Sequence, residues 1–266
     1  MTVQVDNTNP LPLGIRGDRL TGRRILVVGA SSGIGAAAVR RFAEEGASVV
    51  AMARREDRLE ALCKEVTAAG GNASYVTGDV TSEESVAAGV DTVVQRLGGL
   101  DGAFNVAGVG GAGKLHEMET ADFDRVVAVN LRGTFLAMKY QIKAMLESGG
   151  GAIVNTSSIG GLVAAPALPS YGATKMAVNS LTKSAAVGYA GDNIRVNAIA
   201  PAATLSEMLE RWLTTDEAKR NMAAQTPLNF IALPDDMARV ALFLLSDESR
   251  WITGTVLPVD GGASAT

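Results

Sequence analysis

The sequence predicts a single α/β domain built on a doubly wound, seven-stranded parallel sheet with helices on both faces. Two observations carry this prediction: seven nearly continuous apolar runs of strand length, and helix-period segments that alternate with them. The chain contains no internal repeat and no Pro/Gly-rich linker that would divide it. Its 266 residues, 47% of them hydrophobic, are enough to bury one large core.

The expected elements follow one another in a regular order. Strands are expected at residues 24–30, 47–53, 72–78, 101–107, 151–157, 194–200 and 255–261. Helices are expected at 33–45, 56–69, 83–97, 121–147, 170–190 and 235–246, with an extra helical stretch around 205–223. Residues 1–21 are expected to form an N-terminal arm, residues 22–266 the domain, and residues 203–228 a lid over the substrate. Ligands of such sheets bind at the carboxyl ends of the strands, near the point where the strand order reverses.

Composition excludes several classes of function. The net charge is −4 and neither sign forms long blocks, which argues against nucleic-acid and membrane partners. The single cysteine, Cys63, cannot form an intramolecular disulfide, and is compatible with a cytoplasmic location. With only one histidine, His116, the chain lacks ligands for a zinc site of the Cys/His type, and no metal is expected. His116 is interpreted as a solvated loop residue, although a Ser-His-Asp triad would have to use it.

A glycine-rich turn joins the first strand to the first helix. The three glycines fall in a G-x-x-x-G-x-G spacing, which lets the backbone turn tightly and approach a pyrophosphate at the helix N-terminus. Such a turn can also serve packing alone, but its place between the first strand and first helix favours dinucleotide binding in a Rossmann-type domain. The expected contacts are Gly29, Ser31, Ser32, Gly33, Ile34 and Gly35.

The end of the second strand indicates which dinucleotide is bound. An NAD-binding strand usually ends in an acidic residue for the ribose 2′-hydroxyl, whereas this one ends in Ala53 followed by Arg54 and Arg55. No carboxylate repels a 2′-phosphate there, and a guanidinium can hold it with two hydrogen bonds. NADP is therefore favoured over NAD, although the arginines could merely cap a surface turn. Further cofactor contacts are expected at Asp79 and Val80, which could hold the adenine edge, and at the turn formed by Asn105, Ala107 and Gly108.

The stretch SYGATKMAVNS contains a tyrosine, Tyr171, four residues before a lysine, Lys175, so that both emerge on one helix face. Ser158 lies 13 residues before the tyrosine, directly after the fifth strand, and Asn130 lies in the long helix before that strand. A Tyr–Lys pair of this spacing is common on ordinary helices, and Ser157 is adjacent to Ser158. The serine spacing and the glycine turn together make a functional interpretation the stronger one.

With these motifs, the chain resembles the short-chain dehydrogenase/reductase (SDR) family across roughly residues 22 to 262. The motifs are the glycine turn, the N-x-A-G turn, the helix asparagine, the serine 13 before the tyrosine, and Y-x-x-x-K. The resemblance implies that Tyr171 exchanges a proton with the substrate oxygen, that Ser158 hydrogen-bonds that oxygen, and that Lys175 lowers the tyrosine pKa and binds the nicotinamide ribose. It also implies that Asn130 anchors a water for a proton relay, and that the protein is a homotetramer.

The electrostatic role assigned to the lysine is reasonable in magnitude. Bringing a phenol from a pKa near 10 to near 7 requires about 4 kcal/mol, which a unit charge about 4 Å away supplies at an effective dielectric of about 20. Lys175, helped by a positively charged nicotinamide, could therefore make Tyr171 an effective base.

Some positions depart from the usual pattern of the family. Pro201 is followed by Ala202 where a glycine is common, which puts the loop path near the nicotinamide in question; Pro201, Ala202 and Thr204 are nevertheless expected to contact the cofactor. Asn229 and Phe230 replace a common Gly-Arg pair. The expected lid and the neighbouring loops are rich in Gly, Ala, Leu and Met, with Trp212 the one large aromatic.

The leading hypothesis is an NADP(H)-dependent oxidoreductase acting on a ketone or secondary alcohol, with an uncharged, apolar or cyclic substrate. Within the same class, a 3-oxoacyl carrier-protein reductase is the nearest alternative. A non-catalytic dinucleotide sensor or scaffold is the alternative from another class. The intact set of Asn130, Ser158, Tyr171 and Lys175 argues against it.

Overall fold

A computed structural model of the chain describes residues 17–210 and 213–265. Residues 1–16 of the expected arm and Trp212 of the expected lid lie outside the described residues. Where the chain is described, no helix is both long enough and apolar enough to cross a membrane.

One parallel sheet forms the centre of the molecule. Its seven strands lie in the order β3-β2-β1-β4-β5-β6-β7, so the order reverses between β1 and β4. This confirms the predicted seven-stranded, doubly wound sheet. The strands are β1 (Arg24–Val28), β2 (Ser48–Ala53), β3 (Asn72–Thr77), β4 (Gly102–Asn105), β5 (Gly151–Thr156), β6 (Ile194–Pro201) and β7 (Val256–Val259). Each differs from its predicted range by at most a few residues at the ends.

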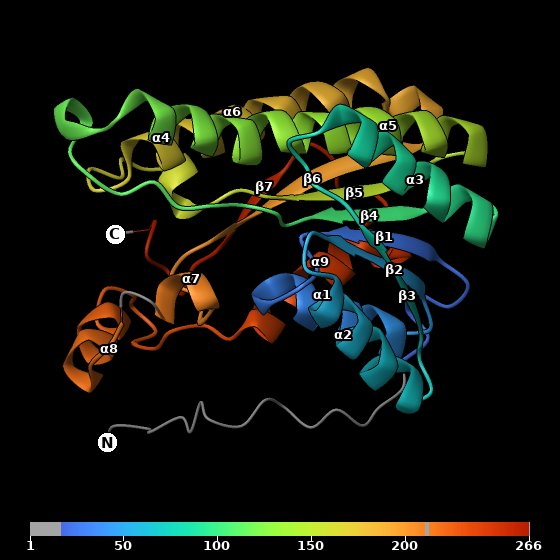
Figure 1. The fold of residues 1–266 in the computed structure, drawn as a ribbon, viewed down its shortest axis with the longest axis horizontal. Coiled ribbons are helices and arrows are strands. Elements are labelled where there is room, and N and C mark those ends of the chain that lie inside the picture. Colours follow the sequence, from blue (N-terminus) through green and yellow to red (C-terminus); the bar gives the residue numbers. More distant parts are fainter. Residues whose placement is uncertain (1–16, 211–212, 266) are drawn as a thin grey trace.

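Helices cover both faces of the sheet (Figure 1). One face carries α1 (Gly33–Glu44), α2 (Glu56–Ala68) and α9 (Pro234–Leu245), and the other carries α3 (Glu83–Leu97), α4 (Thr120–Val126), α5 (Gly133–Ser148) and α6 (Pro169–Gly188). Local signals explain several ends. The Ser82 side chain accepts a hydrogen bond from the Ser85 backbone N–H at the start of α3, and Gly98 ends that helix in the left-handed conformation.

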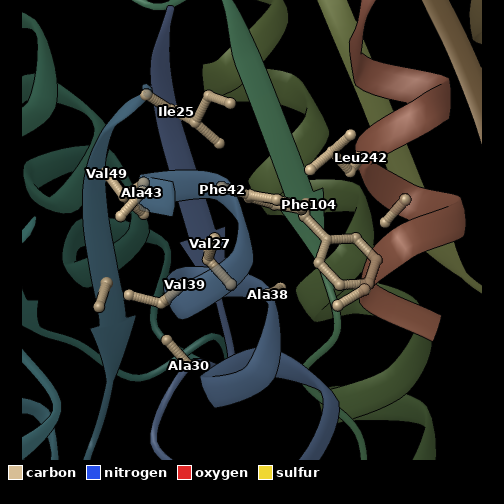
Figure 2. Packing of buried hydrophobic residues seen from close by; sticks show 14 of the residues in the cluster. Ile25, Val27, Ala30, Ala38, Val39, Phe42, Ala43, Val49, Phe104 and Leu242 are labelled. Atoms are coloured by element: carbon tan, nitrogen blue, oxygen red, sulfur yellow. The ribbon is translucent and has the colours of Figure 1, made fainter. Parts of the chain in front are cut away.

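Two separate hydrophobic clusters fill the space between the sheet and its helices. Beneath α1 and α9, the rings of Phe42 and Phe104 lie 6.1 Å apart at an interplanar angle of 59°, close to Val27 and Leu242 (Figure 2). Tilted aromatic pairs of this kind add to the burial of their apolar area. The inner strands are apolar on both faces because each face packs on one of these clusters.

Two predicted helices are divided in the structure. The expected helix at 121–147 consists of α4, a π-helical turn at Val127–Arg132 and α5. The expected stretch at 205–223 consists of α7 (Glu207–Glu210) and α8 (Asp216–Ala223). Thr215 caps the start of α8 by accepting a hydrogen bond from the Ala218 backbone N–H, which gives α8 a start of its own. Both helices lie beside the carboxyl ends of the strands (Figure 1).

Candidate active site

A cavity of about 740 Å³ opens at the carboxyl ends of β1, β2 and β4, next to the point where the strand order reverses. Most of the predicted cofactor contacts line it: Gly29, Ser31, Ser32, Gly33, Ile34, Gly35, Arg54, Arg55, Asp79, Val80, Ala107 and Gly108. The predictions from the glycine turn, from the end of the second strand and from the turn after β4 thus converge on one cavity.

The three glycines of the turn are each required for a different reason. Gly29 has a φ of 96°, and a Cβ there would lie 2.5 Å from the Ala107 backbone nitrogen. A Cβ on Gly35 would lie 2.3 Å from the Gly29 carbonyl oxygen, so this glycine lets α1 pack against the turn. Gly33 is different, because the nearest heavy atom to its Cβ would be 3.4 Å away, on Ser206. The room above Gly33, at the N-terminus of a 12-residue helix, fits a pyrophosphate.

The arginines after β2 border the same cavity. The Arg55 guanidinium donates from Nε and Nη2 to the Ser31 hydroxyl, at 3.1 and 2.9 Å, and from Nη2 to the Ser32 hydroxyl at 2.7 Å. Ala53, at the end of β2, lines the cavity without contributing a charge. Hydroxyls and a guanidinium grouped in this way form a donor set that fits a phosphate. The residues present therefore fit the phosphate groups of a dinucleotide.

Asp79 also lines the cavity. Its Oδ1 accepts hydrogen bonds from the Thr81 backbone N–H at 2.9 Å and from the Thr81 hydroxyl at 2.8 Å. Burial alone would raise the pKa of Asp79, but these hydrogen bonds and the charge of Arg54 outweigh it and hold the pKa below its usual value. The Asp79 carboxylate is thus ionised and fixed in orientation. Both properties suit a group that accepts a hydrogen bond from an adenine amino group.

The Asn105 side chain lies outside the cavity lining and belongs to a buried hydrogen-bond network. Its amide donates to the Gln141 and Asn155 side-chain oxygens, both at 2.9 Å, and Gln141 donates back at 2.8 Å. Asn155 in turn donates to the Thr182 hydroxyl at 3.0 Å, and all four side chains are buried. The Asn105 side chain therefore joins β4, β5, α5 and α6 beneath the cavity, and the residues after it form the cavity wall.

Ser158, Tyr171 and Lys175 come together beside this cavity. The Ser158 hydroxyl hydrogen-bonds the Tyr171 phenol, and the Lys175 ammonium lies over the phenol ring, 5.4 Å from its centroid. Ser157 instead donates its hydroxyl to the Lys175 backbone carbonyl at 3.3 Å, where it anchors α6. The 13-residue spacing therefore selected the serine that faces the tyrosine.

Burial controls the ionisation of the tyrosine and the lysine. Burial raises the pKa of Tyr171 above its ordinary value, and the hydrogen bond to Ser158 offsets only part of that rise. Burial also lowers the pKa of Lys175 to about 8. The Lys175 ammonium donates to the Thr156 carbonyl at 2.7 Å and sits over the ring of Tyr171. In the protein alone, desolvation is the largest cause of both pKa shifts. The positively charged nicotinamide, which the expected role of Tyr171 as a base also requires, is a separate contribution. The arrangement favours Tyr171 as a proton donor.

Asn130 lies in the π-helical turn and is fully buried. Its side chain accepts from the Val109 N–H at 2.8 Å and donates to the Val109 carbonyl at 2.9 Å, so it holds the loop after β4. A Cβ on Gly108 would lie 3.5 Å from Asn130 Oδ1 and 3.7 Å from Lys175 Nζ. Gly108 thus connects the cavity, which it lines, to the catalytic candidates, which lie outside the lining.

The segment after β6 is ordered around a backbone bridge. Thr204 pairs with Ala232, and its hydroxyl donates to the Ala202 carbonyl at 3.2 Å. Pro201, Ala202 and Thr204 lie outside the cavity lining. Among the described residues other than glycine, positive φ angles occur at Asn193 and Asn229, so Ala202 accommodates its Cβ without this strain. Asn229, with a φ of 57°, takes the left-handed conformation where the family commonly has glycine.

Some cavity residues carry no sequence signal that identifies them. Ser206 and Glu207 reach the cavity from the start of α7, and Met118, Asp122 and Arg125 reach it from the segment around α4. Glu207 accepts a hydrogen bond from Arg55 Nη1 at 3.0 Å and is also bonded to Arg58, about 150 positions earlier in the chain. Only the packing of α7 near the start of α1 brings these groups together.

The chain matches the family described as enoyl-(acyl carrier protein) reductase over residues 29–264. It is 46% identical to an A-factor type gamma-butyrolactone 1′-reductase from Streptomyces virginiae, over 91% of this chain and 96% of that protein. It is 37% identical to the 3-oxoacyl-[acyl-carrier-protein] reductase of Thermotoga maritima, over 92% of this chain and 98% of that protein.

Solved structures show the same fold. A crystal structure of levodione reductase superimposes with a TM-score of 0.90 at 36% identity, covering 93% of this chain and all of that one. A crystal structure of an actinorhodin polyketide ketoreductase variant with NADPH superimposes with a TM-score of 0.88 at 33% identity, covering 92% of this chain and 98% of that one.

This protein belongs to the short-chain dehydrogenase/reductase family. It is an oxidoreductase of the kind that acts on alcohol or ketone groups with a nicotinamide dinucleotide.

Proposed function

We propose that this protein is an NADP(H)-dependent carbonyl reductase or alcohol dehydrogenase in which Tyr171 is the general acid and base. The observation that carries the proposal is the grouping of Ser158, Tyr171 and Lys175 beside a cavity whose residues fit a dinucleotide. Gly108, which lines that cavity, lies next to Lys175. The cofactor, when bound, supplies or accepts the hydride.

Each side chain has a chemical task in the reduction of a ketone. Ser158 donates a hydrogen bond that holds the carbonyl oxygen beside the phenol. Tyr171, kept protonated by burial, gives its proton to that oxygen as negative charge develops on it. Lys175, a cation below a pKa of about 8, stabilises the phenolate that remains. In alcohol oxidation the same proton returns to Tyr171.

The preference for NADP(H) rests on the end of β2. Ala53 leaves the 2′ position without a carboxylate, and Arg54, Arg55 and Ser31 surround it with donors. A phosphate there would find charge-assisted hydrogen bonds, whereas a 2′-hydroxyl would leave the guanidinium groups without an anionic ligand. The NADPH-bound ketoreductase of the same fold supports this cofactor.

The substrate is proposed to be an uncharged, rather apolar or cyclic ketone or secondary alcohol. The cavity lining that follows Gly108 in the chain consists of Val109, Gly110, Gly111 and Ala112, and Val129 also lines the cavity. The charged side chains on that side, Asp122 and Arg125, form an ion pair at 3.2 Å and neutralise each other. The similarity to a reductase of a gamma-butyrolactone, a ring compound, agrees with this class.

A 3-oxoacyl-[acyl-carrier-protein] reductase is the second candidate, favoured by the similarity to the Thermotoga maritima enzyme and by the description of the matched family. The two candidates share the site chemistry and differ in what is attached to the ketone. A non-catalytic sensor would have no need for the buried cation of Lys175 beside Tyr171.

The test is to follow the absorbance of reduced nicotinamide with NADPH and then NADH, against cyclic ketones, gamma-butyrolactones that carry a side-chain ketone, and acyl-carrier-protein thioesters. We expect turnover of the free ketones with NADPH. Turnover of thioesters alone would select the second candidate, and faster turnover with NADH would contradict the cofactor assignment. Binding of the nucleotide without turnover of any substrate would support the sensor.

We also propose that the protein is a homotetramer, as the family resemblance implies. Large apolar side chains are exposed on the outer helices and near the C-terminus, including Phe135 on α5, Met176 and Val187 on α6, and Trp251, which is 97% exposed. A second copy of the chain would cover such surfaces. Light scattering coupled to gel filtration should give about four times the mass of 27.4 kDa; the mass of one chain would contradict this.

A further inference from the structure

The lid contributes an acidic side chain to the arginines of the cofactor site. Glu207 Oε2 accepts from Arg55 Nη1 at 3.0 Å, and Glu207 Oε1 accepts from Arg58 Nη1. The hydrogen bonds from the two arginines hold the pKa of Glu207 below its usual value, so the carboxylate is ionised at neutral pH. One lid side chain therefore spans two guanidinium groups of the segment that follows β2.

The arginine that binds Glu207 is also the one that reaches the glycine turn. Arg55 uses Nε and Nη2 for the Ser31 and Ser32 hydroxyls and Nη1 for Glu207. Arg55, both serines and Glu207 all line the cavity. The donor set that fits a 2′-phosphate is thus already bonded to a carboxylate of the same chain.

We propose that Glu207 is a cofactor-specificity residue, whose carboxylate competes with the ribose 2′-phosphate for Arg55 and Arg58. The inference rests on the proposed assignment of this donor set to the 2′ position. It goes beyond that assignment, because it names a residue outside the donor set, Glu207, that weakens the binding of NADP(H) much more than the binding of NAD(H).

The physical reason is the sign of the charges. A carboxylate and a phosphate that share one guanidinium repel each other, so the phosphate must either displace Glu207 or bind beside it at a cost. A 2′-hydroxyl carries no charge and meets no such repulsion. Glu207 and its arginine partners are about 40% exposed, at 38%, 40% and 44%, so solvent screens the pair and the effect is moderate.

Binding of two small nucleotides to the full chain tests this without turnover. Adenosine 2′,5′-bisphosphate and 5′-AMP differ only in the 2′-phosphate, and isothermal titration gives Kd for each. Glu207→Gln keeps the shape of the side chain and removes its charge. We expect it to lower the Kd of the bisphosphate about three- to fivefold and to change that of 5′-AMP less than twofold. Glu210→Gln, on the same short helix and with its side chain exposed, is the matched control and should change neither value.

A second comparison ties the effect to the arginines. In an Arg55→Ala, Arg58→Ala background the substitution at Glu207 should no longer alter the Kd of the bisphosphate, because its partners are gone. In steady-state assays, Glu207→Gln should raise the ratio of kcat/KM for NADPH to that for NADH by the same factor as it changes binding.

The outcomes separate this inference from the proposed function. If the wild type prefers the bisphosphate but Glu207→Gln leaves that preference unchanged or weakens it, Glu207 only docks the lid and the inference is overturned. If the wild type binds the two nucleotides equally, the NADP(H) assignment fails. A preference that then emerges in Glu207→Gln would still support competition by the carboxylate, and equal binding in both proteins would overturn both proposals.

Discussion

The two ends of the candidate active site both contain cations, but the protein holds them in opposite ways. Lys175 is 3% exposed and has no carboxylate partner among its bonds; its ammonium donates to the Thr156 carbonyl and lies over Tyr171. Arg55 is half-exposed and is bonded to two hydroxyls and a carboxylate. Burial lowers the pKa of Lys175 to about 8, whereas hydrogen bonding holds the Arg55 guanidinium in one orientation.

The difference shows that a buried cation and an exposed cation have different functions in this protein. A buried ammonium loses hydration, so its protonation responds to its surroundings and can be coupled to proton transfer. A guanidinium stays charged whatever its surroundings, so it suits the selection of a ligand by charge and geometry. Changes at the buried end should therefore act on rate and pH dependence, and changes at the exposed end on the choice of nucleotide.

The largest effect is expected at the buried end. Tyr171→Phe removes the proton donor and keeps the ring, so kcat for ketone reduction should fall about 10³- to 10⁴-fold. The Kd of adenosine 2′,5′-bisphosphate should not change, because the adenosine end of the cavity is untouched. A variant that folds normally and still reduces ketones at the wild-type rate would remove the basis of the assignment of Tyr171.

Lys175→Met should reduce kcat/KM for reduction about 10²-fold, because the phenolate then forms without a neighbouring cation. Since the substitution also removes a buried charge, the variant should fold at least as stably as the wild type at neutral pH, which thermal unfolding measures. A change in nucleotide affinity without a change in kcat would show that Lys175 serves binding alone.

The lysine pKa also fixes the sign of a pH effect. A lysine pKa lowered to about 8 means that the cation is present below pH 8 and is lost as the pH rises through that value. Tyr171, whose pKa is raised, stays protonated over this range. We expect kcat/KM for ketone reduction to fall about fivefold between about pH 8 and pH 9, as a single essential group of that pKa requires. A profile that stays flat to about pH 10 would show that the lysine charge does not matter.

At the exposed end, Ala53→Asp should shift the ratio of kcat/KM for NADPH to that for NADH at least about tenfold towards NADH. The new carboxylate would repel the 2′-phosphate and could accept a hydrogen bond from a 2′-hydroxyl. Ala53→Asn is the control, since it matches the shape without the charge and should have a much smaller effect. Equal shifts in both variants would mean that bulk at the end of β2, and not charge, causes the change.

The smallest effect on activity is expected from Asn105→Ala. Its amide partners Gln141 and Asn155 would lose their hydrogen bonds while buried, so the free energy of unfolding should fall by about 1–3 kcal/mol. Asn72→Ala, at an exposed bond to Ser48, is the control and should cost less than about 1 kcal/mol. Because Asn105 lies beneath the cavity, nucleotide Kd should change less than about twofold. A large loss of nucleotide affinity would instead indicate that Asn105 contacts the cofactor directly.

Much of this molecule is determined by local sequence. Apolar runs of four to eight residues make strands, most of them buried on both faces, and alternation with helices fixes a parallel sheet, so β1 to β7 could be found without a structure. The spacing of Gly29, Gly33 and Gly35, and of Ser158 before Tyr171, likewise depends on groups that one turn or one strand–helix unit brings together. Such geometry is set by short-range backbone constraints.

Contacts between distant segments were decided by the tertiary structure alone. The meeting of Glu207 with Arg55 and Arg58, and the turn of Asn105 away from the cavity towards Gln141, depend on how separate elements pack, which no periodicity reports. The pKa values of Tyr171 and Lys175 also depend on the tertiary structure, because the sequence spacing indicates only that the two residues are neighbours. How much water surrounds them depends on the whole fold, and desolvation is the largest cause of both pKa shifts.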